Sequence, residues 1–221
     1  CSSRGVIPSP RTRTAAYVGD MYRPQHFAAD ESRAIASATA IGFGHLVATR
    51  AAGLDSTALP FLVSSDGTTV RAHVARSNPL WRAAPCSVLL IVPGADAYVS
   101  PSVYPSKQFD GKVVPTWNYE VVHAHGLLTV RDDERFVRGV VGRLTRRHEA
   151  DEPRPWKMSD SAPEFIDGML RNIVGIEVAI TSLVCKRKLS QNKEERDRLG
   201  AADALLATGN TELAQSMRAP G

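Results

Sequence analysis

Residues 98–126 hold a concentration of side chains that could bind a flat, anionic ligand. Tyr98, Tyr104, Trp117 and Tyr119 are four of the chain's fourteen aromatic residues, and Lys107 adds a positive charge. Aromatic faces can stack on a planar ring, while lysine, hydroxyl and amide groups can bind its polar edge and its charge. Neutral hydrogen-bond donors lie among them at Ser100, Ser102, Ser106, Thr116 and Asn118. The alternative is a barrel wall with a structured loop, in which the aromatic side chains belong to the core.

Two histidines close this stretch, and they could donate a proton or bind a metal ion. His123 and His125 are two residues apart, so on a strand they lie on the same face. Two histidines are not a metal site, and no cluster of His, Cys and carboxylates with metal-ligand spacing accompanies them. We therefore expect no metal site.

The cysteine count indicates a reducing compartment. The chain has three cysteines, an odd number without the spacing of a zinc site or a disulfide scaffold. We expect a cytoplasmic protein. The alternative is an organellar protein, because residues 1–20 are rich in arginine and have no acid before Asp20, as in the remnant of a transit peptide.

Composition is that of an ordinary globular protein with one core and appendages. The chain has 221 residues, 43% of them hydrophobic and 23% charged. No apolar run approaches the roughly 20 residues of a membrane-spanning helix, so we expect no membrane partner. The formal charge of +4 is a weak indication of nucleic-acid binding.

Hydrophobic periodicity predicts a mainly β protein with peripheral helices, arranged as a closed barrel. Alternating apolar segments bounded by turn residues predict strands over 45–49, 58–63, 68–74, 87–92, 97–100, 116–131 and 173–183. Steps of three and four residues predict helices over 31–40, 133–149, 163–171 and 193–208. No Gly-rich phosphate loop or alternation of strands and helices is present, which excludes a Rossmann fold.

The chain divides into three parts. Residues 1–20 cannot bury apolar area, so we expect a disordered N-terminal extension. Residues 21–186 form the barrel with helical insertions, and residues 187–221 form a basic segment and a C-terminal helix that packs on the barrel or on a partner chain. Asn192 and Glu195 have the spacing of a helix N-cap and its third-position acid. The lysines and arginine at 186–188, just before a helix, could bind a phosphate, or they could form a solvated hinge.

Several short motifs, in one order, resemble PaiB-like proteins, which are described as FMN-binding negative transcriptional regulators. The resemblance covers roughly residues 21–208, and its most specific strings are Pro-Thr-Trp-Asn-Tyr at 115–119 and Lys-Leu-Ser-Gln-Asn at 188–192. The other matching segments are 21–27, 59–61, 73–81 and 98–107.

The resemblance implies a split β-barrel of the flavin-reductase and pyridoxamine-phosphate-oxidase type. It also implies a homodimer with FMN at the subunit interface. The candidate FMN-binding residues on the matching positions are His73, Arg76, Asn78, Ser100, Tyr104, Lys107, Thr116, Trp117, Asn118, Tyr119, Lys188, Ser190, Gln191 and Asn192.

Two functions follow from this resemblance. The first is an FMN-binding transcriptional regulator, with DNA or a protein as the partner. The alternative is an FMN-dependent oxidoreductase acting on a small molecule, in which Tyr104, His123 or His125 could donate a proton. A third hypothesis is a DNA-binding protein with a vestigial flavin pocket. Arg143, Arg146 and Arg147 near the end of the helix over 133–149 are the best basic patch for DNA.

Overall fold

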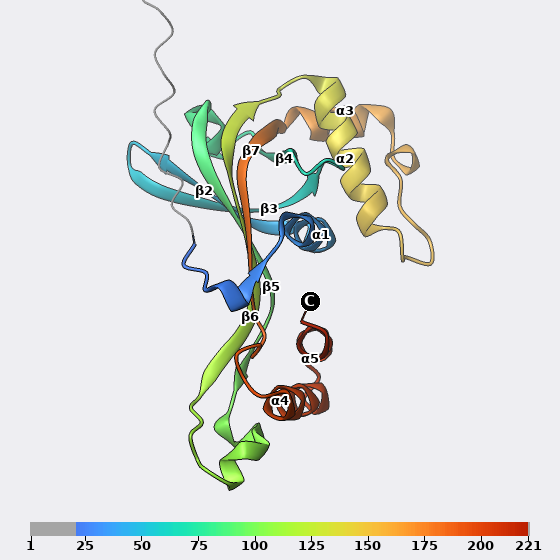
Figure 1. Cartoon of the computed structure of the whole chain (residues 1–221). Coiled ribbons are helices and arrows are strands. Elements are labelled where there is room, and N and C mark those ends of the chain that lie inside the picture. Colours follow the sequence, from blue (N-terminus) through green and yellow to red (C-terminus); the bar gives the residue numbers. More distant parts are fainter. Residues whose placement is uncertain (1–20, 221) are drawn as a thin grey trace, which may run out of the picture.

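The fold is a seven-stranded antiparallel sheet that closes into a barrel, described for residues 21–220 by a computed structural model (Figure 1). The expected extension at 1–20 lies outside the described residues. The strands are β1 Ala28–Ala29, β2 Phe43–Arg50, β3 Gly53–Val63, β4 Thr69–Ala75, β5 Cys86–Val99, β6 Thr116–Val130 and β7 Ile173–Lys188. The α-helices are α1 Glu31–Ile41, α2 Glu134–His148, α3 Pro163–Arg171, α4 Glu195–Ala207 and α5 Thr211–Arg218.

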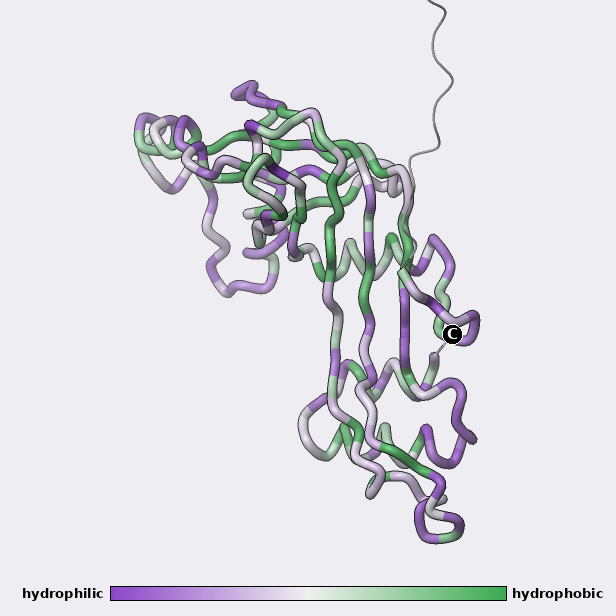
Figure 2. Tube along the Cα trace, turned by 90° about the vertical axis from the view of Figure 1, so that its left-hand side faces the viewer, coloured by the Kyte–Doolittle hydropathy of each residue, from purple (hydrophilic) through white to green (hydrophobic). Residues whose placement is uncertain are grey.

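Strand order explains how the barrel closes. The sheet runs β1-β7-β4-β3-β2-β5-β6, and β6 also pairs with β7, which joins the two ends. Alternate residues point into the barrel, and they form the main core with Leu46, Phe61, Leu90 and Leu128. Figure 2 shows this apolar character along the strands of the barrel. The predicted class, mainly β with peripheral helices, is confirmed.

Helices cover part of the barrel only. Helix α1 contributes Ala34 and Ala38 to the main core and begins at Asp30, whose carboxylate accepts a hydrogen bond from the Arg33 amide. Such an N-cap stabilises a helix by about 1 kcal/mol. Helix α2 packs on β3, β4 and β7, and α3 packs on α2 and β7 (Figure 1). No helix within residues 21–220 is long and apolar enough to cross a membrane.

Strands β5 and β6 extend beyond the barrel as a long hairpin, which we call the arm. The arm comprises residues 93–99 and 116–119 and the loop between them. Figure 1 shows α4 and α5 on one side of the arm only. Their contact forms a second core with Val99, Tyr104, Leu189 and Met217. The division at residues 186 and 187 stays a prediction, and α4 and α5 pack on the arm of their own chain.

Several strand limits differ from the predicted ones. Strand β3 begins at Gly53, five residues before the predicted start, because its polar first half pairs with β2 where the hairpin leaves the core. Strand β5 is one strand with a bulge between Pro93 and Asp96, where the sequence predicts two separate strands. The β6–β7 register shifts between His125 and Gly126.

The C-terminal part contains the largest departures. Strand β7 continues to Lys188, and its charged end pairs with Tyr119–Val121 of β6. The predicted cap at Asn192 is wrong. Helix α4 begins after Glu194, since Ser190 turns the chain at a φ of 64° and its carbonyl accepts a hydrogen bond from the Lys193 amide.

Candidate functional site

The predicted site residues fall into two groups at opposite ends of the chain's fold. His73, Arg76 and Asn78 lie at the end of β4, beside α2 and α3. The other eleven residues lie on the arm or on the turn that follows β7. Trp117 lies at the start of β6, and Arg131 directly follows its last residue. The fourteen residues of extended strand between these two positions span up to roughly 45 Å, so the two groups do not meet within one chain.

One side of the arm carries exposed aromatic rings with two lysines beside them. Lys188 is half-buried, and Lys186 is 9% exposed with its ammonium donating to the Tyr22 carbonyl at 3.0 Å. Tyr98 and Trp117 are cross-strand partners, 49% and 54% exposed, with ring centroids 6.2 Å apart in an edge-to-face arrangement. Tyr119 pairs with Lys188 on β7, and the ammonium group of Lys186 lies 5.4 Å from the Tyr119 ring centroid. We call Tyr98, Trp117, Tyr119, Lys186 and Lys188 the arm face. It can stack on a planar ring and bind an anion.

Lys188 is held at the edge of these rings. Its ammonium nitrogen donates to the Trp117 carbonyl oxygen at 2.6 Å and contacts Thr116 Oγ1. Burial, and then the charge of Lys186, lower the pKa of Lys188. A partly desolvated cation beside exposed aromatic rings binds an anionic group more strongly than a solvated lysine would.

A shallow cleft adjoins the arm face at the β5 bulge. It has a volume of about 360 Å³ and is lined by Trp117, Tyr119, Asp96, Pro93, Gly94, Glu120 and Val121. A Cβ atom at Gly94 would lie 3.1 Å from Glu120 Cβ, so a side chain at position 94 would be in close contact with Glu120. The bulge therefore makes room beside the two aromatic rings.

Other predicted residues of the same strings lie on the covered side of the arm. Tyr104 is buried in the second core, with the Lys193 ammonium 5.5 Å from its ring centroid, and burial raises the pKa of Tyr104. Asn118 is fully buried and donates to Ser190 Oγ at 2.9 Å and to Met217 Sδ at 3.3 Å. These groups fasten α5 and the turn after β7 to the arm.

The turn after β7 forms hydrogen bonds with itself. Gln191 donates to the Arg187 carbonyl at 2.6 Å and accepts from the Leu189 amide at 2.7 Å. Asn192 is exposed. The specific Lys-Leu-Ser-Gln-Asn string is thus a structural turn in which Lys188 alone belongs to the arm face.

The two remaining predicted residues of the arm lie in its loop. Ser100 caps a short 3-10 helix by accepting a hydrogen bond from the Ser102 amide at 3.2 Å. Lys107 is exposed on the next turn of the loop. Both stay predictions as ligand-binding residues.

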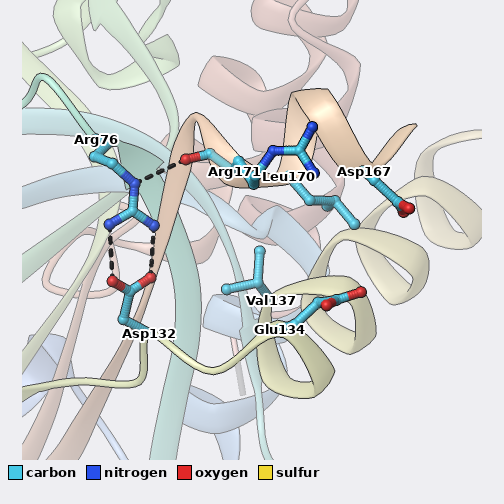
Figure 3. Close-up of a pocket in the computed structure, with 7 residues that line it drawn as sticks. All are labelled: Arg76, Asp132, Glu134, Val137, Asp167, Leu170 and Arg171. Carbon is cyan, nitrogen blue, oxygen red and sulfur yellow. Dashed lines mark hydrogen bonds and ion pairs between the residues drawn. The ribbon is translucent and has the colours of Figure 1, made fainter. Parts of the chain in front are cut away.

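At the other end of the barrel, Arg76 and Asn78 already have partners. Arg76 makes a bidentate pair with Asp132, with N–O distances of 2.7 and 2.8 Å, and donates to the Arg171 and Ile173 carbonyls (Figure 3). Asn78 caps the short helix at 79–83 and donates to Thr57 Oγ1 at 3.1 Å. Their donors stabilise loops, and their role toward a ligand stays a prediction.

His73 differs because its ring is not fully partnered. Its Nδ1 atom is buried and has no hydrogen-bond partner within residues 21–220. Burial lowers the pKa of His73, so the neutral imidazole is favoured. A neutral ring nitrogen in this position could accept from, or donate to, a group outside the described chain.

The outer face of the sheet next to the arm is uncovered and apolar. Phe43 and Leu127 are 48% and 44% exposed, and Leu89, Ile91 and Val121 are half-buried. His45, His123 and His125 lie on this face, which we call the outer sheet face. Burial, and then the neighbouring His125, lower the pKa of His123. A face of this composition is typical of a protein interface.

Similarity to known proteins identifies the family of this chain. Residues 21–182 match the family model described as "Putative FMN-binding domain". The chain belongs to this FMN-binding family. It is 28% identical to the protease synthase and sporulation protein PAI 2 of Bacillus subtilis over 88% of this chain and 94% of that protein. The resemblance to PaiB-like proteins is confirmed.

Solved structures confirm the split-barrel fold. The flavocytochrome Anf3 of Azotobacter vinelandii superposes with a TM-score of 0.55, at 16% identity, over 77% of this chain and 74% of Anf3. An FAD- and heme-binding protein of Mycobacterium smegmatis has a TM-score of 0.52, also at 16% identity, over 81% of this chain and 78% of that protein. At these identities the likeness concerns the fold.

The cofactor is FMN or a related flavin, and the arm face fits it. Two tyrosines and a tryptophan offer a surface for the isoalloxazine ring, half-buried Lys188 offers a cation for the phosphate, and buried Lys186 adds positive charge behind it. The sequence analysis named Tyr98 among the aromatic residues and the lysines at 186–188 as a possible phosphate site, but neither Tyr98 nor Lys186 was among the fourteen candidate FMN-binding residues. The signal for both was available, because period-two alternation along paired strands places them beside Trp117 and Tyr119.

Proposed function

We propose that this protein is a homodimeric flavoprotein regulator in which FMN lies on the arm face of one protomer and is enclosed by the partner. The observation that carries the proposal is the one-sided arm. Its covered side packs on α4 and α5, while its other side leaves Trp117 and Tyr98 about half exposed beside Lys188. Exposed aromatic rings next to a cation favour a bound planar anion over bare solvent.

The outer sheet face supports the dimer. It continues from the arm face along β5 and β6, and its exposed apolar side chains would be buried by a second copy. Across three strands, His45, Ile91 and His123 form one register row. Burying such a patch is favourable by roughly 25 cal/mol per Å² of apolar surface.

A dimer would also reconcile the two groups of predicted residues. Within one chain the arm face and His73 lie at opposite ends of the fold. One FMN could contact both groups only if they came from different protomers. The buried, unpartnered Nδ1 atom of His73 is the atom that such a contact would satisfy.

FMN, when bound, supplies reversible electron and hydride exchange at its isoalloxazine ring. The chain's residues would orient the ring with Trp117, Tyr98 and Tyr119 and hold the phosphate with Lys188, while buried Lys186 would add its positive charge. The fold would also keep the ring partly shielded from water by the partner. These roles suit a flavin that signals its redox state through the shape of the dimer.

The regulator role is supported by the Bacillus subtilis relative. The name of that relative, protease synthase and sporulation protein PAI 2, refers to sporulation, which is a cellular process and not a single reaction. A DNA or protein partner would carry the output. The basic patch predicted for DNA is divided in the structure: Arg147 donates to the Thr39 and Ala40 carbonyls, and Arg146 lines a separate hollow beside Trp156.

An oxidoreductase is the second candidate, favoured by the cleft of about 360 Å³ beside Trp117 and Tyr119. A small molecule could reach a flavin on the arm face through this cleft. In that case Tyr119 could donate a proton from the cleft wall. Tyr104 lies on the covered side, and His123 and His125 lie on the outer sheet face.

The first test is a visible absorbance spectrum of the purified protein before and after FMN is added, with the particle mass measured alongside. A bound-flavin spectrum on a dimer supports the proposal, and a protein that takes up no flavin refutes it. Anaerobic addition of nicotinamide nucleotides then separates the two functions. Rapid bleaching of the flavin favours the oxidoreductase, while an unreduced flavin in a dimer that binds a promoter fragment or a protein partner favours the regulator.

A further inference from the structure

Four arginines from three different elements surround one hollow on the far side of the barrel from the arm. They are Arg71 on β4, Arg131 just after β6, and Arg135 and Arg143 on α2. The hollow has a volume of about 500 Å³, and Asp133, Phe136 and Gly139 complete its lining. We call these four side chains the arginine pocket. None of them belongs to the arm face or to the predicted FMN-binding residues.

Two of the arginines are fixed in place by one carboxylate. Arg71 Nε donates to Glu177 Oε2 at 2.7 Å, and Arg131 Nη1 donates to Glu177 Oε1 at 3.0 Å. The Arg131 guanidinium also stacks over Phe136, 4.8 Å from the ring centroid. A guanidinium has five N–H donors, and each of these two uses a single nitrogen for its hydrogen bonds within residues 21–220. The other donors are held in position by the same contacts and remain free for a ligand.

The other two arginines have no acidic partner within the described residues. Arg135 and Arg143 lie eight residues apart on one face of α2 and are exposed. Gly139, midway between them, has no side chain, and Arg143 Nη1 lies 3.6 Å from where its Cβ atom would be. The Arg143 guanidinium thus lies against Gly139, which also lines the hollow.

Charge counting identifies the class of ligand. Four guanidinium groups face two carboxylates, Asp133 and Glu177, which leaves a surplus of two positive charges. A phosphate monoester carries about −1.5 to −2 charges near pH 7 and has three acceptor oxygens. Guanidinium groups match phosphate oxygens in pairs of parallel hydrogen bonds.

We propose that the arginine pocket binds the phosphate group of a phosphate monoester, as a second anion site distinct from the arm face. The shape favours this ligand over nucleic acid, because the arginines converge on one hollow. Binding a DNA backbone requires cations spread along the surface at the spacing of successive phosphates. This inference rests on the proposed function in one respect: the FMN phosphate lies at the arm face and not in this pocket.

Titration calorimetry with inorganic phosphate and phenyl phosphate, at constant ionic strength, tests the proposal on the full chain loaded with FMN and then freed of unbound FMN, which is itself a phosphate monoester. The decisive variant is Arg135→Gln with Arg143→Gln, since both side chains are exposed and the fold does not depend on them. The matched control is Arg146→Gln, an exposed arginine of the same helix that lines another hollow. We expect saturable binding to the unaltered protein, at least tenfold weaker binding to the double variant, and unchanged binding to the control.

Two further experiments identify other sources of the anion. If the double variant binds FMN more weakly and riboflavin equally well, the pocket holds the flavin's own phosphate and the second site is refuted. If a DNA duplex binds with a steep salt dependence that the double variant loses, while phosphate and phenyl phosphate do not bind, the ligand is nucleic acid and the proposal is wrong. Absence of phosphate binding to the unaltered protein also refutes it.

Discussion

Lys188 offers the sharpest substitution in the arm face because its role separates the two halves of FMN. Its ammonium group donates to the Trp117 carbonyl at 2.6 Å, and burial lowers its pKa. If Lys188 binds the phosphate, Lys188→Met removes a charge-assisted hydrogen bond from the complex. Such a bond contributes about 1.5–3 kcal/mol, which corresponds to FMN binding weaker by roughly tenfold to 150-fold.

Riboflavin lacks the phosphate, so its affinity should change by less than about threefold under the same substitution, which is under 1 kcal/mol. Quenching of flavin fluorescence, titrated with FMN and with riboflavin, gives both dissociation constants. Lys112→Met is the matched control, because Lys112 is an exposed lysine of the arm loop that is not among the candidate FMN-binding residues. Equal losses for FMN and riboflavin, or no loss for either, would refute the placement of the phosphate at Lys188.

The structure also explains why Lys188 should be changed alone. The neighbouring Arg187 is only 5% exposed and pairs with Glu120 at 3.1 Å. A double substitution of Arg187 and Lys188 would mix a loss of ligand binding with a loss of stability, because removing one partner of a buried ion pair leaves an uncompensated charge.

Three other substitutions and one labelling experiment test separate parts of the account. Trp117→Ala should weaken FMN binding by roughly fivefold to 150-fold, since stacking on an aromatic ring contributes about 1–3 kcal/mol. Unchanged affinity in a folded protein would contradict the placement of this ring. Arg187→Met should lower the free energy of unfolding by about 3–5 kcal/mol. For a chain of this size, that loss corresponds to a melting temperature lower by roughly 6–20 °C. A calorimetric scan that matches the unaltered protein would disprove the buried ion pair. Hydrogen bonds from Ser64 and then Thr68 lower the pKa of Asp66 to about 2. The stabilising effect of the Asp66 carboxylate is therefore present above the unfolded pKa near 3.8 and is lost as the pH falls through about 2. Asp66→Asn should lower the melting temperature near pH 7 but not near pH 2, and an equal decrease at both pH values would exclude this linkage. Burial raises the pKa of the Cys185 thiol to about 11, so a thiol reagent near pH 8 should label Cys185 only when the protein unfolds. If folded Cys185→Ser has one rapidly labelled thiol fewer than the folded unaltered protein, Cys185 is not buried.

The barrel could be predicted from sequence because its inward residues alternate with outward ones. Val174, Ile176 and Val178 on β7 repeat with period two, and each faces the main core. Helix α1 was predicted for a local reason, since the Asp30 cap and Gly42 at a φ of 63° determine its limits. These signals act within a few residues and need no knowledge of the rest of the fold.

The end of β7 could not be predicted from the same pattern. Lys186, Arg187 and Lys188 do not resemble a strand, yet they continue the pairing with β6. They belong to the sheet because their partners come from distant segments: Tyr22 and Tyr119 for Lys186, and Glu120 for Arg187. Tertiary contacts here override local preference.

The candidate site was predicted as a set of strings, and the structure separates each string by strand alternation. Trp117 and Tyr119 reach the arm face, while Asn118 between them is buried on the other side. The arginine pocket carries no sequence signature, because Arg71 and Arg131 meet only through Glu177 on a third strand. Such convergence depends on strand register, which sequence patterns alone did not define.

The central claim is that FMN lies between two protomers, and the dimer dissociation constant measured by sedimentation with and without FMN tests it most directly. A ligand that binds only the dimer must stabilise the dimer by mass action. At an FMN concentration of about 100 times its Kd, the account predicts a dimer dissociation constant lowered by at least about 100-fold. A monomer that binds FMN as tightly as the dimer, with an unchanged dissociation constant, would contradict the shared site.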